Sequence, residues 1–224
     1  MTTIMHHGRR SLKWLPLLLF PILLLASCSE SDDTVEEYPD WQNKNTAYWT
    51  STVSKAQAAI AKGDTSWKIF RNYSIEDTLS SAPITDYIVV NVLESGTGSG
   101  SPLYTDSVRV RYEGRLLPST SYSNGYVFDT TWPDGTTDAT AGVADFQVRV
   151  LTDGFATAVQ HMHIGDKWLV YVPWTLAYGE SGSSAIPGYS VLRFTIQLVA
   201  YSHAGSSLPP FKAKRGWYEL GSSE

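Results

Sequence analysis

The serine and histidine residues that most often do covalent or metal chemistry are poorly spaced for it in this sequence. Ser181 lies in the run Gly-Glu-Ser-Gly-Ser at residues 179–183, whose last position lacks the glycine that a Gly-x-Ser-x-Gly nucleophile elbow requires. His161 and His163 are two positions apart near the predicted end of a helix, so their side chains diverge and make a poor metal-binding pair. The sequence therefore gives little support to a hydrolase or a metal enzyme.

Aromatic side chains suited to lining an apolar pocket are abundant instead. The chain holds 8 tryptophans, 13 tyrosines and 7 phenylalanines among its 224 residues. A pocket with aromatic walls and one or two placed polar groups can accelerate a reaction without covalent chemistry, because it can stabilise the transition state better than the ground state. The elements that would position such a pocket can be predicted from the periodicity of apolar residues.

Four runs of alternating apolar and polar residues predict strands. Between the second and third runs the apolar period becomes that of a helix, and Gly165 follows as a stop signal. Four or more antiparallel strands with one short helix form an α+β design, in which the helix covers the apolar face of the sheet. The apolar positions are Val108, Val110 and Tyr112; Phe146, Val148 and Val150; Trp168, Val170 and Val172; Leu192, Phe194, Ile196 and Leu198; and, for the helix, Phe155, Ala158, Val159 and Met162.

Residues 84–202 resemble the FKBP-type peptidyl-prolyl cis-trans isomerases. Six sequence blocks occur in the order of that family: VRYEG, FDTT, DGF with HM seven residues later, YVPWTLAYGESG, AIPG and VLRFTIQLV. The resemblance implies an antiparallel, strongly curved sheet wrapped around one short helix. It also implies a protein that accelerates rotation about Xaa-Pro bonds in exported or envelope proteins, by a desolvated aromatic pocket with no covalent chemistry, no cofactor and no metal.

The same resemblance assigns the site residues. It implies catalytic roles for three of them: the Tyr178 hydroxyl and the Ile186 backbone N–H donate hydrogen bonds to the substrate, and the Asp129 carboxylate faces the rotating amide. Seven further residues would bind the substrate: Tyr112, Phe128, Phe146, Leu151, Thr152, Phe155 and Phe194.

Two of these positions depart from the family's usual pattern. Phe155 stands where the family usually has a tryptophan as the floor of the pocket, and Thr152 stands where it usually has an aliphatic residue. The phenyl ring is smaller and lacks an N–H, and the threonine makes the rim more polar. The alternative function is therefore a catalytically weak FKBP-fold chaperone, or a peptide- or protein-binding module on the cell surface.

The first 27 residues have the pattern of a bacterial lipoprotein signal. Arg9, Arg10 and Lys13 precede a leucine-rich run that is too short to span a membrane. The small residues before Cys28 resemble a lipobox, which implies cleavage before this cysteine and its lipidation; an ordinary signal peptide with an incidental cysteine is the alternative. We expect an outer membrane lipoprotein, similar to those of the Bacteroidota, on the periplasmic face or at the cell surface.

Charge and cysteine content limit the partners. Cleavage after residue 27 would remove three of the 17 basic residues and none of the 22 acidic ones, which leaves a net charge of −8. Such a surface repels nucleic acid and anionic headgroups, so we expect attachment to a membrane only through the lipid anchor. Because Cys28 is the only cysteine, an intrachain disulfide and a cysteine-based zinc site are excluded. The expected partners are proline-containing segments of unfolded or envelope proteins.

Before the domain we expect an acidic tether at residues 28–39 and a helical extension at residues 40–83. A helix over residues 40–62 would be capped by Asp40 and followed by Gly63. Its apolar stripe either packs on the chain's own domain, which we favour, or forms a homodimer through residues 40–62. The stripe consists of Trp41, Tyr48, Trp49, Thr52, Val53, Ala56 and Ile60.

The remaining segments carry weaker patterns. Residues 63–83 have no predicted element, and residues 86–94 are predicted to form the first strand of the sheet. The Gly/Ser-rich residues 95–102 are predicted to be a loop. The tail at residues 203–224 is expected to be loosely attached.

Overall fold

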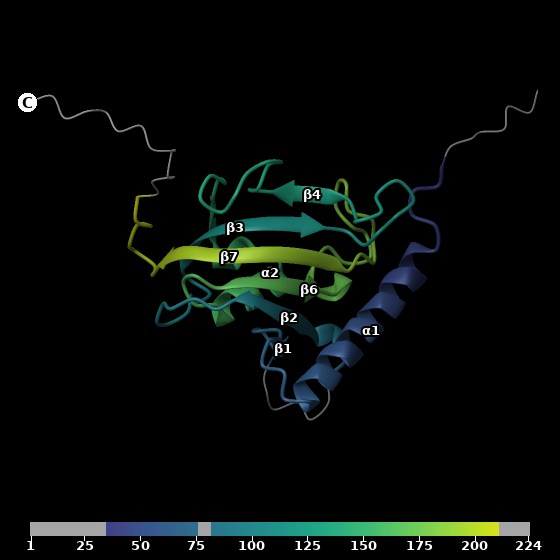
Figure 1. The fold of residues 1–224 in the computed structure, drawn as a ribbon, viewed down its shortest axis with the longest axis horizontal. Coiled ribbons are helices and arrows are strands. Elements are labelled where there is room, and N and C mark those ends of the chain that lie inside the picture. Colours follow the sequence, from purple (N-terminus) through teal and green to yellow (C-terminus); the bar gives the residue numbers. More distant parts are fainter. Residues whose placement is uncertain (1–34, 76–81, 211–224) are drawn as a thin grey trace, which may run out of the picture. The chain divides into compact units, whose positions relative to one another are not determined.

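The computed structural model describes residues 35–75 and 82–210, drawn in colour in Figure 1. The predicted signal peptide, Cys28, most of the tether and the end of the tail lie outside the described residues. Within the described ranges, no helix combines the length and the apolar character needed to cross a membrane.

Seven strands form one sheet in which every pairing is antiparallel. Their order is β1-β2-β6-β7-β3-β4, and β5 also pairs with β3. The helix α2 lies behind the sheet in Figure 1 and contacts β1, β2 and β6. This confirms the expected α+β architecture of a sheet on one short helix, with a helical segment before it. The strands are β1 (Trp67–Arg71), β2 (Tyr87–Glu94), β3 (Ser107–Arg115), β4 (Val127–Thr130), β5 (Ala144–Gln147), β6 (Lys167–Val172) and β7 (Leu192–Ser202); the α-helices are α1 (Trp41–Ala61) and α2 (Asp153–His161); and single 3-10 turns are η1 (Ile84–Asp86), η2 (Val148–Val150) and η3 (Trp174–Leu176).

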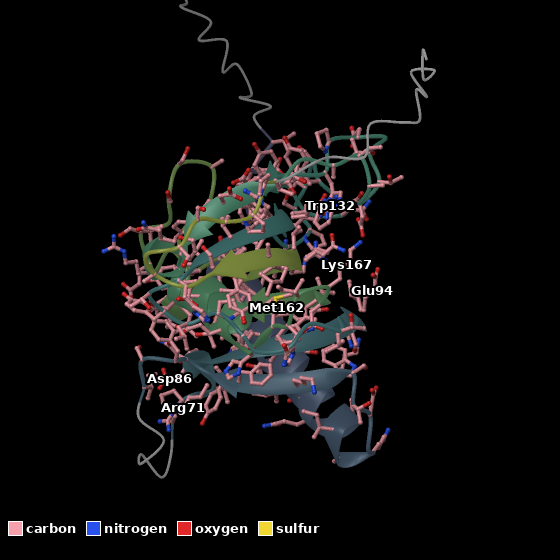
Figure 2. The ribbon with its side chains drawn as sticks, turned by 90° about the vertical axis from the view of Figure 1, so that its left-hand side faces the viewer. Arg71, Asp86, Glu94, Trp132, Met162 and Lys167 are labelled. Carbon is pink, nitrogen blue, oxygen red and sulfur yellow. The ribbon has the colours of Figure 1, made fainter. Side chains whose placement is uncertain are left out.

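The core lies between α2 and the sheet. All four predicted apolar residues of the helix are buried, and so are the alternating residues of β6 and β7. Gly154 allows α2 to approach β6 closely, because a Cβ at this position would lie 2.2 Å from Cγ1 of Val172. The fully buried Met162 lies at the centre of the molecule in Figure 2.

The predicted strand through residues 146–150 is wrong in its second half. β5 ends at Gln147, and the 3-10 turn η2 follows, closed by a 3.1 Å hydrogen bond from the Leu151 N–H to the Val148 carbonyl oxygen. A 3-10 turn has three residues per turn, so the side chains no longer alternate between two faces. Val148 is buried as predicted, whereas Val150 is 67% exposed.

The helix α1 forms where predicted, with one correction at its start. Asp40 occupies the N-cap position, but it has a left-handed backbone (φ 53°) and makes no side-chain capping bond. Its carboxylate accepts a 2.6 Å hydrogen bond from Nδ2 of Asn43 instead. Gly63 follows the helix end with φ 83°, in the left-handed conformation that favours glycine after a helix.

The apolar stripe of α1 packs on its own chain, as the favoured interpretation expected. Trp49, Val53 and Ala56 form a buried cluster with Val89 of β2 and with Val191. Ile60 was predicted to belong to the stripe but is 41% exposed, because it lies in the last turn, beyond the buried part of the helix.

β1 was not predicted. It pairs with β2 from Trp67 opposite Asn91 to Arg71 opposite Tyr87, so the predicted first strand is the second one. The sheet therefore begins inside the predicted helical extension. The start of the tail is also held more firmly than expected, since His203 Nδ1 lies 2.9 Å from the buried Asp106 carboxylate.

An ionic cluster holds the polar insertion between β4 and β5 against the sheet. Lys167 Nζ donates to both carboxylate oxygens of Asp138, at 3.1 and 3.0 Å. The same ammonium lies 5.1 Å from the centre of the Trp132 ring and 3.9 Å from Glu94, whose side chains gather beside it in Figure 2. This insertion joins the strands that carry Phe128, Asp129 and Phe146.

We predict that Trp49→Ala lowers the free energy of unfolding by about 3–5 kcal/mol, because it leaves a cavity between α1 and the sheet. The measurement is urea unfolding of the full chain. Ile60→Ala is the matched control on the same helix and should change stability by no more than about 0.5 kcal/mol. Small and equal effects of both substitutions would show that α1 is not packed on the sheet in solution.

Candidate active site

One cavity of about 490 Å³ brings together all ten site residues that the resemblance assigned within the domain. They come from β3, β4, β5, α2, β7 and the loops around them, so residues more than 80 positions apart in the sequence share one pocket. The lining residues are Tyr112, Phe128, Asp129, Phe146, Val150, Leu151, Thr152, Phe155, Tyr178, Ser183, Ser184, Ala185, Ile186 and Phe194.

Phe155 forms the floor of this cavity. It lies in the first turn of α2 and is only 4% exposed, which makes it part of the core as well. Its ring meets Tyr112 edge to face at 5.8 Å and 89°, and Phe194 at 5.2 Å and 81°. Edge-to-face pairs of this kind fix ring orientation in addition to burying apolar area.

Two further aromatic residues complete the walls. Phe128 meets Phe194 at 5.6 Å and 89°, and Phe146 meets Tyr112 at 5.8 Å and 66°. Gly114 makes room for the first of these contacts, because a Cβ there would lie 2.4 Å from two atoms of the Phe128 ring. The contact between Phe128 and Phe194 therefore depends on Gly114, although Gly114 is not itself among the lining residues.

The polar groups of the cavity include two phenol hydroxyls and one carboxylate, beside the hydroxyl-bearing Thr152, Ser183 and Ser184. The Tyr112 hydroxyl donates a hydrogen bond to Oδ2 of the exposed Asp129, and burial together with this bond raises the pKa of Tyr112. Tyr178 is 39% exposed at the mouth, where burial and the nearby charge of Asp129 raise its pKa as well. Both phenols are therefore protonated, and able to donate, throughout the neutral pH range.

The Ile186 backbone N–H, which is expected to donate to the substrate, has a partner inside its own loop in this structure. That N–H donates to the Ser183 carbonyl oxygen at 2.7 Å, and the Ser183 N–H returns a 2.9 Å bond to the Ile186 carbonyl oxygen. The amide is thus used within its own loop, although the buried Ile186 side chain lines the cavity. Thr152 also lines it, and its N–H has no hydrogen-bond partner within the described residues.

Four lining residues were not predicted: Val150, Ser183, Ser184 and Ala185. Val150 reaches the rim because η2 turns it away from the sheet. The other three stand in sequence between Tyr178 and Ile186. Since both of those residues were assigned to the pocket, the loop that joins them had to border it, and this was the available signal.

The two histidines lie apart from this cavity. His161 ends α2 and stacks on Phe70 at 4.1 Å and 11°, where burial lowers its pKa. His163 Nδ1 lies 3.6 Å from the Asp166 carboxylate. In residues 35–75 and 82–210 no three His, Cys, Asp or Glu side chains are grouped as metal ligands would be.

Comparisons with known proteins show which family residues 98–199 resemble. Residues 98–199 match the family described as FKBP-type peptidyl-prolyl cis-trans isomerase. The macrophage infectivity potentiator of Trypanosoma cruzi is 31% identical over 119 residues, which cover 53% of this chain and 55% of that protein. The FKBP-type 22 kDa peptidyl-prolyl cis-trans isomerase of Escherichia coli is 37% identical over 119 residues, covering 49% and 52%.

A solved structure of FkpA from Escherichia coli aligns with 73% of this chain and 65% of its own, at a TM-score of 0.45 and 23% identity. The chain spans about half the length of the curated relatives it matches. Residues 98–199 are thus similar to the FKBP-type peptidyl-prolyl cis-trans isomerases.

Proposed function

We propose that the protein is a peptidyl-prolyl cis-trans isomerase that accelerates rotation about Xaa-Pro bonds in exported or envelope proteins. The observation that carries the proposal is the single cavity floored by Phe155, with aromatic walls and with Tyr178 and Asp129 among its few polar lining residues. Its lining suits a proline ring and an amide, and it contains no cysteine, histidine or lysine.

Rotation about the imide bond needs no nucleophile. The barrier of about 18–20 kcal/mol comes from amide resonance, and uncatalysed interconversion takes tens to hundreds of seconds. Water supports that resonance by hydrogen-bonding the partly charged carbonyl oxygen, so an apolar pocket removes part of the barrier. Each 1.36 kcal/mol removed gives a tenfold faster reaction, and about 7 kcal/mol gives roughly 10⁵-fold.

The polar groups then favour the twisted amide over the planar one. The aromatic rings hold the proline side chain, the Tyr178 hydroxyl donates to a substrate carbonyl, and the Asp129 carboxylate faces the rotating bond. The Ile186 backbone N–H is the second donor, and it exchanges its bond to the Ser183 carbonyl oxygen for one to a substrate carbonyl. Only interactions that strengthen in the twisted state accelerate the reaction.

A binding module with little catalysis is the second candidate. The smaller Phe155 floor and the polar Thr152 favour it, because both reduce the apolar area that would desolvate the amide. Such a module would hold the same proline-containing segments without speeding their rotation. The two candidate functions therefore share a class of ligand, and they differ in whether the bound Xaa-Pro bond is isomerised faster.

The proposed location is the outer membrane, through lipid on Cys28, on the periplasmic face or at the cell surface. A relative from Legionella longbeachae, 35% identical over 114 residues, is named outer membrane protein MIP, which supports an envelope setting. We propose a monomer rather than a homodimer through residues 40–62, since the apolar stripe of α1 is buried in its own chain.

We predict that Asp129→Ala lowers kcat/KM by about 10- to 100-fold, the range for losing one hydrogen bond to a charged group. Tyr178→Phe deletes one neutral donor, so its loss should be tenfold or less. The measurement is isomerisation of a chromogenic Xaa-Pro peptide, with thermal melts beside each variant. Asp134→Ala, which removes an exposed carboxylate outside the cavity, is the matched control and should leave kcat/KM unchanged.

We predict that Phe155→Trp holds or raises kcat/KM, because it restores the larger floor that the family usually has. The same peptide assay measures it. Absence of activity in both the wild type and Phe155→Trp, with peptide binding retained, would establish the binding module and end the isomerase proposal.

We predict that Cys28→Ser abolishes lipid attachment and leaves an unprocessed precursor, because only the cysteine sulfur accepts the diacylglycerol group. Incorporation of labelled fatty acid, followed on a gel, measures this. Equal labelling of wild type and Cys28→Ser would contradict the lipid anchor without affecting the proposed activity.

A further inference from the structure

The start of α1 is hydrogen-bonded to the end of the loop that borders the cavity. Trp41 Nε1 donates to Ser190 Oγ at 2.9 Å, and Ser190 Oγ donates in turn to the Pro187 carbonyl oxygen at 2.6 Å. α1 lies outside the region matched by the family, residues 98–199, whereas Pro187 and Ser190 lie inside it. The connection therefore joins a segment outside the matched region to the loop that borders the pocket.

Asn45, one helical turn further on, makes a second connection. It is fully buried; its Oδ1 accepts a 2.7 Å hydrogen bond from the Val191 N–H, and its Nδ2 donates at 2.7 Å to the Trp41 carbonyl oxygen. Water cannot replace these partners at buried positions, so breaking either bond leaves a polar group unsatisfied. A buried asparagine on the apolar stripe of a helix is otherwise unfavourable, and these bonds account for it.

The loop at the other end of these bonds, residues 178–190, is called the pocket loop here. It carries Tyr178 at its start and Ile186 near its end, and both line the cavity. Its two arms are joined by a 3.0 Å hydrogen bond from the Tyr189 N–H to the Gly179 carbonyl oxygen, while a 3.1 Å bond from the Gly182 N–H to the Tyr178 carbonyl oxygen closes a turn within the first arm. A shift of one arm is therefore passed to the other.

The backbone of the pocket loop is strained and depends on its surroundings. Ser184 (φ 44°) and Tyr189 (φ 60°) both have left-handed conformations, which are unfavourable for residues with a Cβ. Tyr189 directly precedes Ser190 and Val191, the two residues that α1 holds. The bonds from α1 thus fasten the chain next to one of its strained positions.

We propose that Trp41 and Asn45 are positioning residues, which hold the pocket loop so that Tyr178 and Ile186 face the bound Xaa-Pro segment. The proposal rests on the proposed function. In this proposal α1 has two roles. The packing cluster around Val53 stabilises the fold, and the hydrogen bonds of Trp41 and Asn45 set the geometry of the pocket.

The test compares Asn45→Ala and Trp41→Phe with Val53→Ala in the full chain. Trp41→Phe keeps an aromatic ring and removes only the N–H donor, so it should fold. Val53→Ala is the matched control, because it weakens the packing of the same helix without removing a bond to the loop. For each variant we would measure the melting temperature, kcat/KM, and hydrogen exchange of the Ile186 and Tyr189 amides.

We expect Asn45→Ala and Trp41→Phe to lower kcat/KM by about two- to tenfold, the range for one hydrogen bond, and to speed exchange of both loop amides. Val53→Ala should lower the melting temperature but should change neither kcat/KM nor the exchange of the two loop amides. A double-mutant cycle of Trp41→Phe with Ser190→Ala should show that the two losses do not add, because both remove the Trp41–Ser190 bond; Ser190→Ala removes the bond to Pro187 in addition.

If hydrogen exchange of the Ile186 and Tyr189 amides is no faster in Asn45→Ala than in Val53→Ala, the proposal is overturned, whatever the value of kcat/KM. Equal kcat/KM in these two variants at matched melting temperature overturns it as well. A wild type without isomerase activity would end the proposed function alone; faster loop exchange in Asn45→Ala would then still support the coupling between α1 and the pocket loop.

Discussion

The edge-to-face contacts of Phe155 with Tyr112 and Phe194 join the protein's core to its pocket. A sheet with one apolar face needs a helix to cover it, and α2 does so closely because Gly154 has no Cβ to meet Val172. The first turn of that helix places Phe155 between two strands. Its buried side forms part of the core, and its remaining surface is the pocket floor, so the sheet cannot pack without shaping the cavity.

The polar groups depend on this arrangement. Tyr112 belongs to β3, and its ring is fixed by Phe155 and Phe146, so its hydroxyl is directed at Asp129 rather than at solvent. The ionic cluster around Lys167 fastens the insertion that follows β4 and precedes β5. The Asp129 side chain thus lies exposed beside the aromatic walls, where it accepts the Tyr112 bond.

The periodic parts of this structure could be predicted from the sequence, because alternation and helical spacing reflect burial directly. The ten pocket residues were located in another way, by the resemblance of the ordered sequence blocks to the FKBP family, and the structure places all ten around one cavity. The features that could not be predicted from the sequence concern the backbone. A period of two does not reveal the 3-10 turn that exposes Val150, and nothing in a side chain shows that the Ile186 N–H is used by Ser183. β1 is short and mixes Lys68 and Arg71 with its apolar residues, so it resembled a loop.

The boundary predicted at residue 84 does not separate two physical units. β1 covers the edge of β2, which would otherwise present unpaired N–H and C=O groups to other chains. α1 covers the other face of the same region through Trp49 and Val53, and Asn45 supplies the acceptor for a buried N–H inside the matched domain. Asn45 could not be singled out from the sequence, because its burial and its hydrogen bonds are visible only in the structure. The segment before the domain is therefore part of the structure that holds the pocket.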